Sequence, residues 1–340
     1  MISRLITLVQ DKCRSHVGLF KKQSEVFNFI HIPKTAGSSL RKALDEEFSG
    51  RGVFDYGENA KETHSLIKRF NYDIQDKFEL SQRIKNMGKV VIGGHVYCSQ
   101  YCGIASLNNT ATIIRQPFER IKSHYKHAKV KQNFQGSFRE FIMEPKNQNL
   151  QTKYLNYIPI QAIGTVGLTN SFSKSIELMN ERWSTALIEY KENLADNSFF
   201  DESTTDLEEE KQLFERLNKL DFDLFNSAEM IFRNSCYFKE QCLPDKRAFC
   251  SMEQSSGIIN GWGFAYGDEA PLLIKVVLVD NEEEHDIKCI QFRPFLNGIG
   301  APRDGYIGFE LPTDNYKGEI KIIDPISEME LFSTKGTLNS

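Results

Sequence analysis

The strongest constraint on the fold comes from three short apolar runs, each of which ends at a polar or glycine-containing loop. The runs are VFNFIHI (26–32), KVVIGG (89–94) and TATIIR (110–115). Continuous apolar runs of this length are typical of strands that are buried on both faces. Because helical stretches alternate with them from about residue 25 to 235, we predict an α/β domain around a parallel sheet. The loops after the strands should gather at one edge of the sheet, where open α/β sheets bind ligands.

The first of these loops, PKTAGSS (33–39), has the composition of an anion site. An apolar pattern at helical spacing follows it, at Leu40, Ala43, Leu44 and Phe48. The loop therefore opens a helix, and the backbone N–H groups of Gly37, Ser38 and Ser39 lie at the helix N-terminus, where a phosphate binds well. Lys34 precedes the glycine, unlike the lysine of the nucleotide loop G-x-x-x-x-G-K-[ST], which places it beside the reacting group. An ordinary turn capped by Ser38 is the alternative.

Two further groups of residues follow the other strands. Arg115 ends a strand, Pro117 suits the first turn of a helix, and Arg120 and Ser123 are one helical turn apart. An arginine with a hydroxyl is well suited to a second phosphate. His95 follows a strand and two glycines on the same predicted edge as Lys34 and Arg115. Imidazole titrates near neutral pH, so His95 is a candidate general base, although a lone histidine is more often structural.

With these residues in place, the sequence resembles a known family. HIPKTAGSS (31–39) is similar to the 5′-phosphosulfate-binding loop of the carbohydrate sulfotransferases related to heparan sulfate 2-O-sulfotransferase. RQPFERIKSHY (115–125) resembles their 3′-phosphate motif R-x-P-x-x-R-x-x-S-x-Y, and GGHVYC supplies a G-H between the two. The stretch NLQTKYL (149–155) also resembles a family segment that lines the cleft. The resemblance covers roughly residues 25–235 and implies a P-loop-like sulfotransferase fold that uses 3′-phosphoadenosine 5′-phosphosulfate (PAPS).

The resemblance also implies roles for individual residues. Lys34 would contact the transferred sulfuryl group and the leaving phosphate, and His95 would be the base. The donor would be held by Pro33, Lys34, Thr35, Ala36, Gly37, Ser38, Ser39, Arg115, Arg120, Ser123 and Gln151. Among these, Gly37, Ser38 and Ser39 would hold the 5′-phosphate, and Arg115 and Ser123 the 3′-phosphate. No metal is implied, because the leaving group of the donor is already activated. The acceptor would be a hydroxyl of a glycan or another molecule, which the sequence does not identify.

The C-terminal part has a different character. We predict a sulfotransferase domain at 25–245, a polar linker at 246–256 and a small all-β sandwich at 257–340, whose strands are separated by Asn, Gly and Pro turn signals. This part is similar to a β-sandwich module that is appended to many bacterial glycosyltransferases and sulfotransferases. Trp262, Phe264 and Tyr266 offer a candidate sugar-stacking face, but aromatic residues in small sandwiches usually pack in the core.

The N-terminal residues and the composition bear on location and partners. Residues 1–24 predict a basic amphipathic helix, which either packs against the first domain or lies on a membrane surface, and their apolar run is too short to span one. The net charge of −4 gives no basic excess for nucleic acid. Seven cysteines without framework or metal-ligand spacing indicate reduced thiols in a cytoplasm.

Two other functions stay open at this stage. A small-molecule kinase would share the fold, but it should carry the G-x-x-x-x-G-K-[ST] loop and an acidic magnesium ligand. A non-catalytic glycan-binding protein built around the sandwich would need no donor site. Both predict a different outcome from a sulfotransferase when the chain is titrated with adenosine 3′,5′-bisphosphate, the product of the donor.

Overall fold

A computed structural model describes residues 25–334 except 102, 157, 191–204, 243–246, 256, 267–269, 299, 327 and 329. The first part of the chain forms a five-stranded sheet in the order β2-β3-β1-β4-β5, and every pairing in it is parallel. Its strands are β1 (Val26–Ile30), β2 (Gly52–Asp55), β3 (Val90–Gly94), β4 (Thr110–Ile114) and β5 (Thr165–Leu168). The prediction of a parallel α/β domain is therefore confirmed, and β1, β3 and β4 are the three strands expected from the apolar runs.

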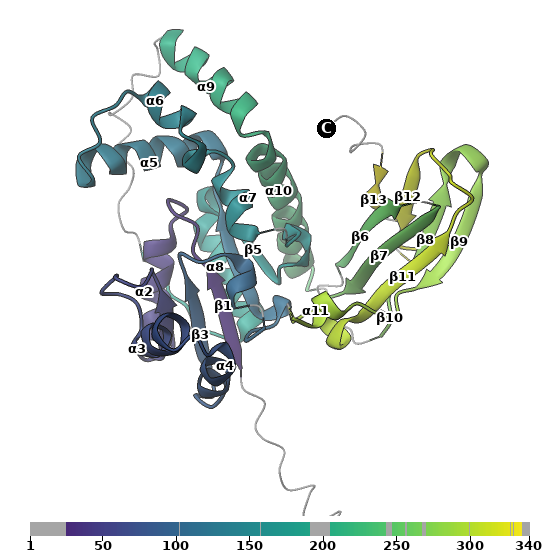
Figure 1. Ribbon diagram of the computed structural model, residues 1–340, viewed down its shortest axis with the longest axis horizontal. Helices are drawn as coiled ribbons and strands as arrows, with labels where there is room; N and C mark the ends of the chain where they lie inside the picture. Colours follow the sequence, from purple (N-terminus) through teal and green to yellow (C-terminus); the bar gives the residue numbers. More distant parts are fainter. Residues whose placement is uncertain are drawn as a thin grey trace, which may run out of the picture.

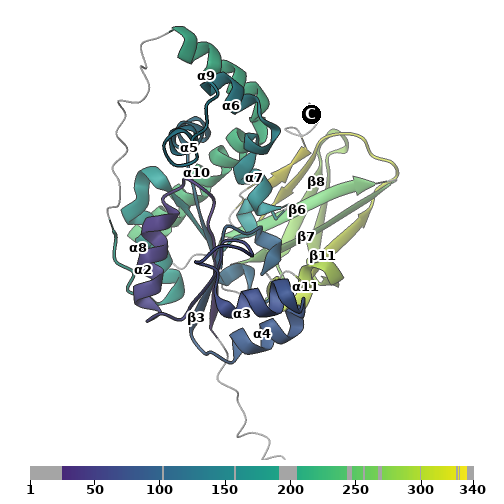
Figure 2. The same ribbon diagram turned by 60° about the vertical axis from the view of Figure 1, so that its left-hand side comes forward.

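Helices cover both faces of this sheet (Figure 2). One face carries α2 (Gly37–Glu47) and α8 (Phe172–Trp183), and the other carries α3 (Ser65–Ile67), the π-helix η1 (Lys68–Asp73) and α4 (Lys77–Lys85). On the first face Phe27, Phe29 and Val91 pack against Leu40 of α2 and Ile176 of α8. Because both faces are covered, the strand residues are buried throughout, which accounts for their continuous apolar sequences.

A further group of helices lies beyond the carboxyl ends of the strands (Figure 1). It consists of α5 (Pro117–Lys131), α6 (Phe138–Met143), α7 (Leu150–Leu155), α9 (Thr205–Leu217) and the start of α10 (Lys219–Glu240). The rest of α10 continues alongside the sheet, where Ile231 shares a core with Val166 of β5. Aromatic residues of α5, α6 and α9, among them Phe118, Phe141 and Phe214, form its core. Single 3₁₀ turns connect the elements of this domain, at η2 (Cys98–Gln100), η3 (Leu107–Asn109), η4 (Pro145–Asn147), η5 (Ile160–Ala162) and η6 (Thr169–Ser171).

The C-terminal part is a sandwich of two antiparallel four-stranded sheets, in the orders β10-β11-β7-β6 and β13-β12-β8-β9. The first sheet contains β6 (Ala248–Ser255), β7 (Ile258–Ala265), β10 (Gln291–Phe292) and β11 (Tyr306–Pro312). The second contains β8 (Leu273–Leu278), β9 (Glu283–Lys288), β12 (Ile320–Ile323) and β13 (Glu330–Ser333). Short helical segments join the strands, at η8 (Val279–Asn281), α11 (Pro294–Gly298) and η9 (Pro302–Gly305). Apolar side chains of both sheets, such as Ile259 and Ile274, meet in a common core, so the predicted all-β sandwich is confirmed.

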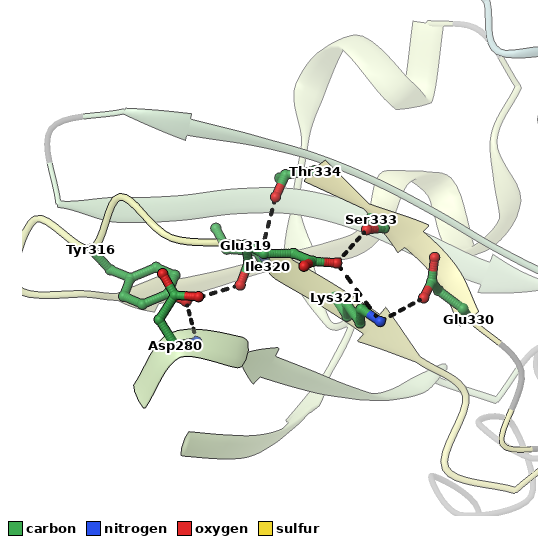
Figure 3. A network of polar contacts seen from close by, with 8 residues as sticks. All are labelled: Asp280, Tyr316, Glu319, Ile320, Lys321, Glu330, Ser333 and Thr334. Carbon is green, nitrogen blue, oxygen red and sulfur yellow. Dashed lines mark hydrogen bonds and ion pairs between the residues drawn. The ribbon is translucent and has the colours of Figure 1, made fainter. Parts of the chain in front are cut away.

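Polar contacts fasten the last strands of the second sheet (Figure 3). The hydroxyl of Tyr316 accepts a hydrogen bond from the backbone N–H of Asp280 at 2.9 Å and donates one to the carbonyl oxygen of Glu319 at 3.0 Å. The ammonium group of Lys321 lies 3.7 Å from the carboxylate of Glu319 and 3.5 Å from that of Glu330. These contacts join β12 to its neighbours on both sides and hold the end of the sandwich together.

One expectation for this part of the chain is wrong. Most of the predicted linker at 246–256 is strand β6, which is an edge strand of the first sheet and pairs with β7 along its whole length. Its polar residues are compatible with a strand because an antiparallel sheet commonly has one solvated face. For the three aromatic residues, core packing is confirmed over a sugar-stacking face, since Trp262 is 9% exposed and Phe264 and Tyr266 are each 2% exposed.

These buried aromatic residues instead join the sandwich to the α/β domain. They share one core with Ile160 of η5, with Ile163, which follows it, and with Ile231 of α10. The hydroxyl of Tyr266 donates to the carbonyl oxygen of Ile163 at 3.2 Å. The two parts are therefore packed against each other through an apolar interface. Residues 1–24, where an amphipathic helix was expected, lie outside the described residues. None of the described helices combines the length and apolarity needed to cross a membrane.

Candidate active site

The ends of the central strands bring the predicted residues to one edge of the sheet. The β1 to β3 ladder continues one residue beyond the strands, because the N–H of His31 donates to the carbonyl oxygen of Gly94 at 2.9 Å. On the other side of β3, the N–H of His95 donates to the carbonyl oxygen of Asp55 at 2.9 Å. A Cβ atom on Gly94 would lie 2.0 Å from that same carbonyl oxygen, and Gly94 has a φ of 133°, so only glycine fits before His95.

The loop between β1 and α2 has a backbone that is built to meet an anion. Lys34 and Ala36 both lie in the left-handed region, with φ of 71° and 67°. Ala36 is the N-cap of α2, and no side chain caps the helix there. The alternative of a turn capped by Ser38 is therefore wrong. The first N–H groups of a helix have no partner within the helix, so those of α2 are available to an anion that binds at its N-terminus.

Two residues of this loop serve its internal structure. The hydroxyl of Thr35 donates to the carbonyl oxygen of Ile32 at 2.9 Å, and Thr35 is completely buried. A Cβ atom on Gly37 would lie 1.9 Å from the imidazole ring of His31. The missing side chain at Gly37 thus makes room for a histidine as well as for a ligand. Among the other loop residues, Pro33 and Ala36 are half-buried, Ser38 is exposed and Ser39 is buried.

Arg115 extends from the end of β4 to this loop. Its Nη1 donates to the carbonyl oxygen of Lys34 at 3.2 Å, so the two cations predicted to bind a donor lie next to each other. Burial, and then the positive charge of Arg115, lower the pKa of Lys34. Burial also lowers the pKa of Arg115, while Glu119 opposes this shift. Adjacent, partly desolvated cations of this kind are stabilised when an anion binds between them.

His95 lies in a cluster of rings beside the loop. Its ring centroid is 4.3 Å from that of His31 and 4.9 Å from that of Tyr56, and the hydroxyl of Tyr56 lies 3.1 Å from Nδ1 of His31. The guanidinium of Arg41 lies over the Tyr56 ring at 4.7 Å. His95 still has a solvent-exposed surface. Partial burial of its ring, followed by the charges of Arg41 and Lys34, lowers the pKa of His95 to about 4, so it is neutral at pH 7.

The remaining predicted residues lie behind this edge. Arg120 is completely buried, and its Nη2 donates to the carbonyl oxygen of Asn147 at 3.4 Å. Burial lowers the pKa of Arg120 to about 10 despite the opposing charge of Asp221. Ser123 is half-buried on α5, and Gln151 is completely buried with both polar atoms of its side chain bonded to the backbone of Arg115. The hydrogen bonds of Arg120 and Gln151 described above are all to other parts of the protein. Direct contact of these two residues with a donor stays a prediction.

Three residues of the site were not singled out from the sequence, namely His31, Arg41 and Tyr56. His31 precedes the loop, and Arg41 follows Gly37 by about one helical turn, so the spacing held a signal for both. Tyr56 was missed because it follows β2, whose four residues GVFD are too short to give a clear strand pattern. A neutral imidazole, an uncapped helix N-terminus and two cations therefore meet at one sheet edge.

Comparisons with known proteins add little beyond this geometry. No protein-family model matches the chain, and no curated protein does. Among solved structures, the chain is similar to a sulfotransferase from Alicyclobacillus acidocaldarius, with 15% sequence identity and a TM-score of 0.35. The likeness covers 59% of this chain and 96% of that one. It is too distant to bear on activity, so the residues themselves must carry the functional conclusion.

Proposed function

We propose that this protein is a sulfotransferase that moves a sulfuryl group from PAPS to a hydroxyl of a carbohydrate. The observation that carries the proposal is the convergence of Lys34, Arg115 and His95 at the carboxyl edge of the sheet, next to the N-terminus of α2. The donor has two phosphate groups and one group to transfer. The site offers a helix N-terminus and a separate arginine for the two phosphates, and Lys34 for the group that is transferred. The neutral imidazole of His95 is available for the proton of the acceptor.

The donor is held at both ends in this proposal. The first N–H groups of α2, with the hydroxyls of Ser38 and Ser39, bind the 5′-phosphate. Arg115 and Ser123 bind the 3′-phosphate, for which the planar guanidinium is well suited. Lys34 then lies at the bridging oxygen between phosphate and sulfate. Its order in the loop, before the glycine, supports this position, since a lysine after the glycine would be directed at a longer phosphate chain.

Transfer is an in-line displacement at sulfur. The acceptor oxygen forms a bond to sulfur while the bond from sulfur to the 5′-phosphate oxygen breaks, and the electron pair of that bond goes to the phosphate. Lys34 and the helix N-terminus offset the charge that develops there. The acceptor proton passes to the neutral ring of His95. Because the negative charge of a bound donor raises the low pKa of His95, the imidazole becomes a stronger base when the donor is present.

Incubation with ³⁵S-labelled PAPS and a panel of glycans tests this proposal. We expect the wild-type protein to label a glycan and to release adenosine 3′,5′-bisphosphate in equal amount. His95→Ala should abolish labelling, with a loss of at least about 100-fold, while the affinity for adenosine 3′,5′-bisphosphate is retained. Wild-type turnover by His95→Ala would show that the base is wrongly assigned, and loss of nucleotide affinity in that variant would indicate a general structural defect.

A further inference from the structure

The main chain of Arg115 is held by a side chain from α7. The N–H of Arg115 donates to Oε1 of Gln151 at 3.0 Å, and Nε2 of Gln151 donates to the carbonyl oxygen of Arg115 at 2.9 Å. The amide of Gln151 thus pairs with both polar groups of one residue, as a neighbouring strand would. This pairing is located where β4 ends and the chain turns into α5, and it leaves the guanidinium of Arg115 free to reach the loop carbonyl of Lys34.

Gln151 is itself held by a buried carboxylate of α10. Oδ2 of Asp221 accepts from the N–H of Gln151 at 3.1 Å, and Oδ1 accepts from both the N–H and the hydroxyl of Thr152 at 2.8 Å. Asn149 is the N-cap of α7 but makes no side-chain cap, so Asp221 satisfies these N–H groups from another helix. Asp221 and Gln151 are both 0% exposed. The negative charge of Asp221 also opposes the lowering of the Arg120 pKa that burial causes.

A second layer fixes the position of this carboxylate. The N–H of Asp221 donates to Oδ1 of Asn149 at 3.2 Å, and the N–H of Asn149 donates to Oδ1 of Asn218 at 2.7 Å. Asn218 is also completely buried, at the junction between α9 and α10. Buried polar groups that are fully paired are rigid, because any movement leaves one of them unsatisfied. The start of α10, the start of α7 and the end of β4 are therefore linked into one unit.

We propose that Asp221 and Gln151 are positioning residues that hold Arg115 in place to bind the 3′-phosphate of the donor. This inference rests on the proposed function, in which Arg115 binds that phosphate. Gln151 acts through the backbone of Arg115, and Asp221 acts through Gln151. A charged carboxylate that accepts three hydrogen bonds sets the position of α7 more firmly than a neutral cap, because hydrogen bonds to ionised groups are the stronger ones. This positioning role replaces, for Gln151, the direct contact with the donor that the resemblance implies.

Titration with two nucleotides separates positioning from general stability. Adenosine 3′,5′-bisphosphate carries the phosphate that Arg115 binds, whereas 5′-AMP lacks it. Gln151→Glu keeps the shape of the side chain but loses the N–H donated to Arg115, and Asp221→Asn removes the charge. We expect both variants to bind the bisphosphate about tenfold more weakly than wild type and to bind 5′-AMP with unchanged affinity. Thr152→Val, which removes one hydrogen bond to Asp221, should have a smaller effect in the same direction.

Controls make each outcome decisive. Ser235→Ala deletes a hydroxyl of α10 whose hydrogen bond, among the described residues, goes to Ile231 of the same helix, and it should leave both affinities within twofold. Equal weakening of both nucleotides by Gln151→Glu would overturn the inference, because a merely structural role would affect the whole site. If Arg115→Ala abolishes the preference for the bisphosphate but Gln151→Glu and Thr152→Val retain it, only the positioning role fails. If wild type has no such preference, the proposed function itself fails.

Discussion

Gly37→Ala tests the packing between the anion loop and the ring cluster at His95. A Cβ atom at this position would lie 1.9 Å from Cδ2 and Nε2 of His31, while ordinary contact begins at 3.4 Å, so the ring must retreat by about 1.5 Å. His31 is only 6% exposed, and Phe29 stacks on one side of it at 5.6 Å with His95 at 4.3 Å. It therefore cannot move without disturbing its neighbours. We expect Gly37→Ala to lower the free energy of unfolding by about 1–3 kcal/mol.

A double-mutant cycle in urea unfolding isolates this contact. His31→Ala removes the ring and leaves space for the new methyl group. In the presence of His31→Ala, Gly37→Ala should therefore cost less than about 0.5 kcal/mol, and the two substitutions should be strongly non-additive. Gly298→Ala is a matched control, since a Cβ atom there meets nothing within 4 Å. Additive costs in the cycle, or wild-type stability of Gly37→Ala alone, would refute the described packing of His31 against the loop.

Two further predictions concern the base and the domain interface. His95 acts as a base only when its ring is unprotonated, and the pKa of that ring in the free protein is about 4. The value of kcat/KM should therefore be level from pH 8 to about pH 5 and fall as the pH is lowered further. A fall centred near the ordinary histidine pKa of 6.5 would contradict the described environment. Trp262→Ala should lower the free energy of unfolding in urea by about 3–5 kcal/mol, because it leaves a cavity in the core between the sandwich and the α/β domain. Phe292→Ala is the control, and because its side chain is 43% exposed it should cost less than about 1 kcal/mol. Equal costs of the two substitutions would argue against the interface.

The elements that position the site could be predicted from the sequence because their signals are local. Strands β1, β3 and β4 are buried on both faces and so have continuous apolar sequences. Parallel strands end at the same edge, which is why Lys34, His95 and Arg115 could be placed together without a structure. The structure adds the contact between Arg115 and Lys34 and the rings around His95.

Other features depend on contacts that no local pattern encodes. The family resemblance of the stretch 149–155 predicts Gln151 at the donor site, yet its amide pairs with the backbone of a residue 36 positions earlier. Asp221 is 70 positions away from Gln151, and nothing in the sequence near it distinguishes a buried cap from a solvated carboxylate. The many polar residues of β6, an edge strand, favour a linker when they are read from the sequence alone. In each case, tertiary packing determines the role of the residue.

The most direct test of the proposed function is a calorimetric comparison of three nucleotides with the wild-type protein. Adenosine 3′,5′-bisphosphate has the 3′-phosphate that Arg115 is proposed to bind, whereas 5′-AMP and ATP do not, and ATP is the ligand that a kinase would prefer. A PAPS-dependent sulfotransferase should bind the bisphosphate at least about tenfold more tightly than either of the others. Binding of ATP as tightly as the bisphosphate, or no preference for the bisphosphate over 5′-AMP, would contradict the proposal.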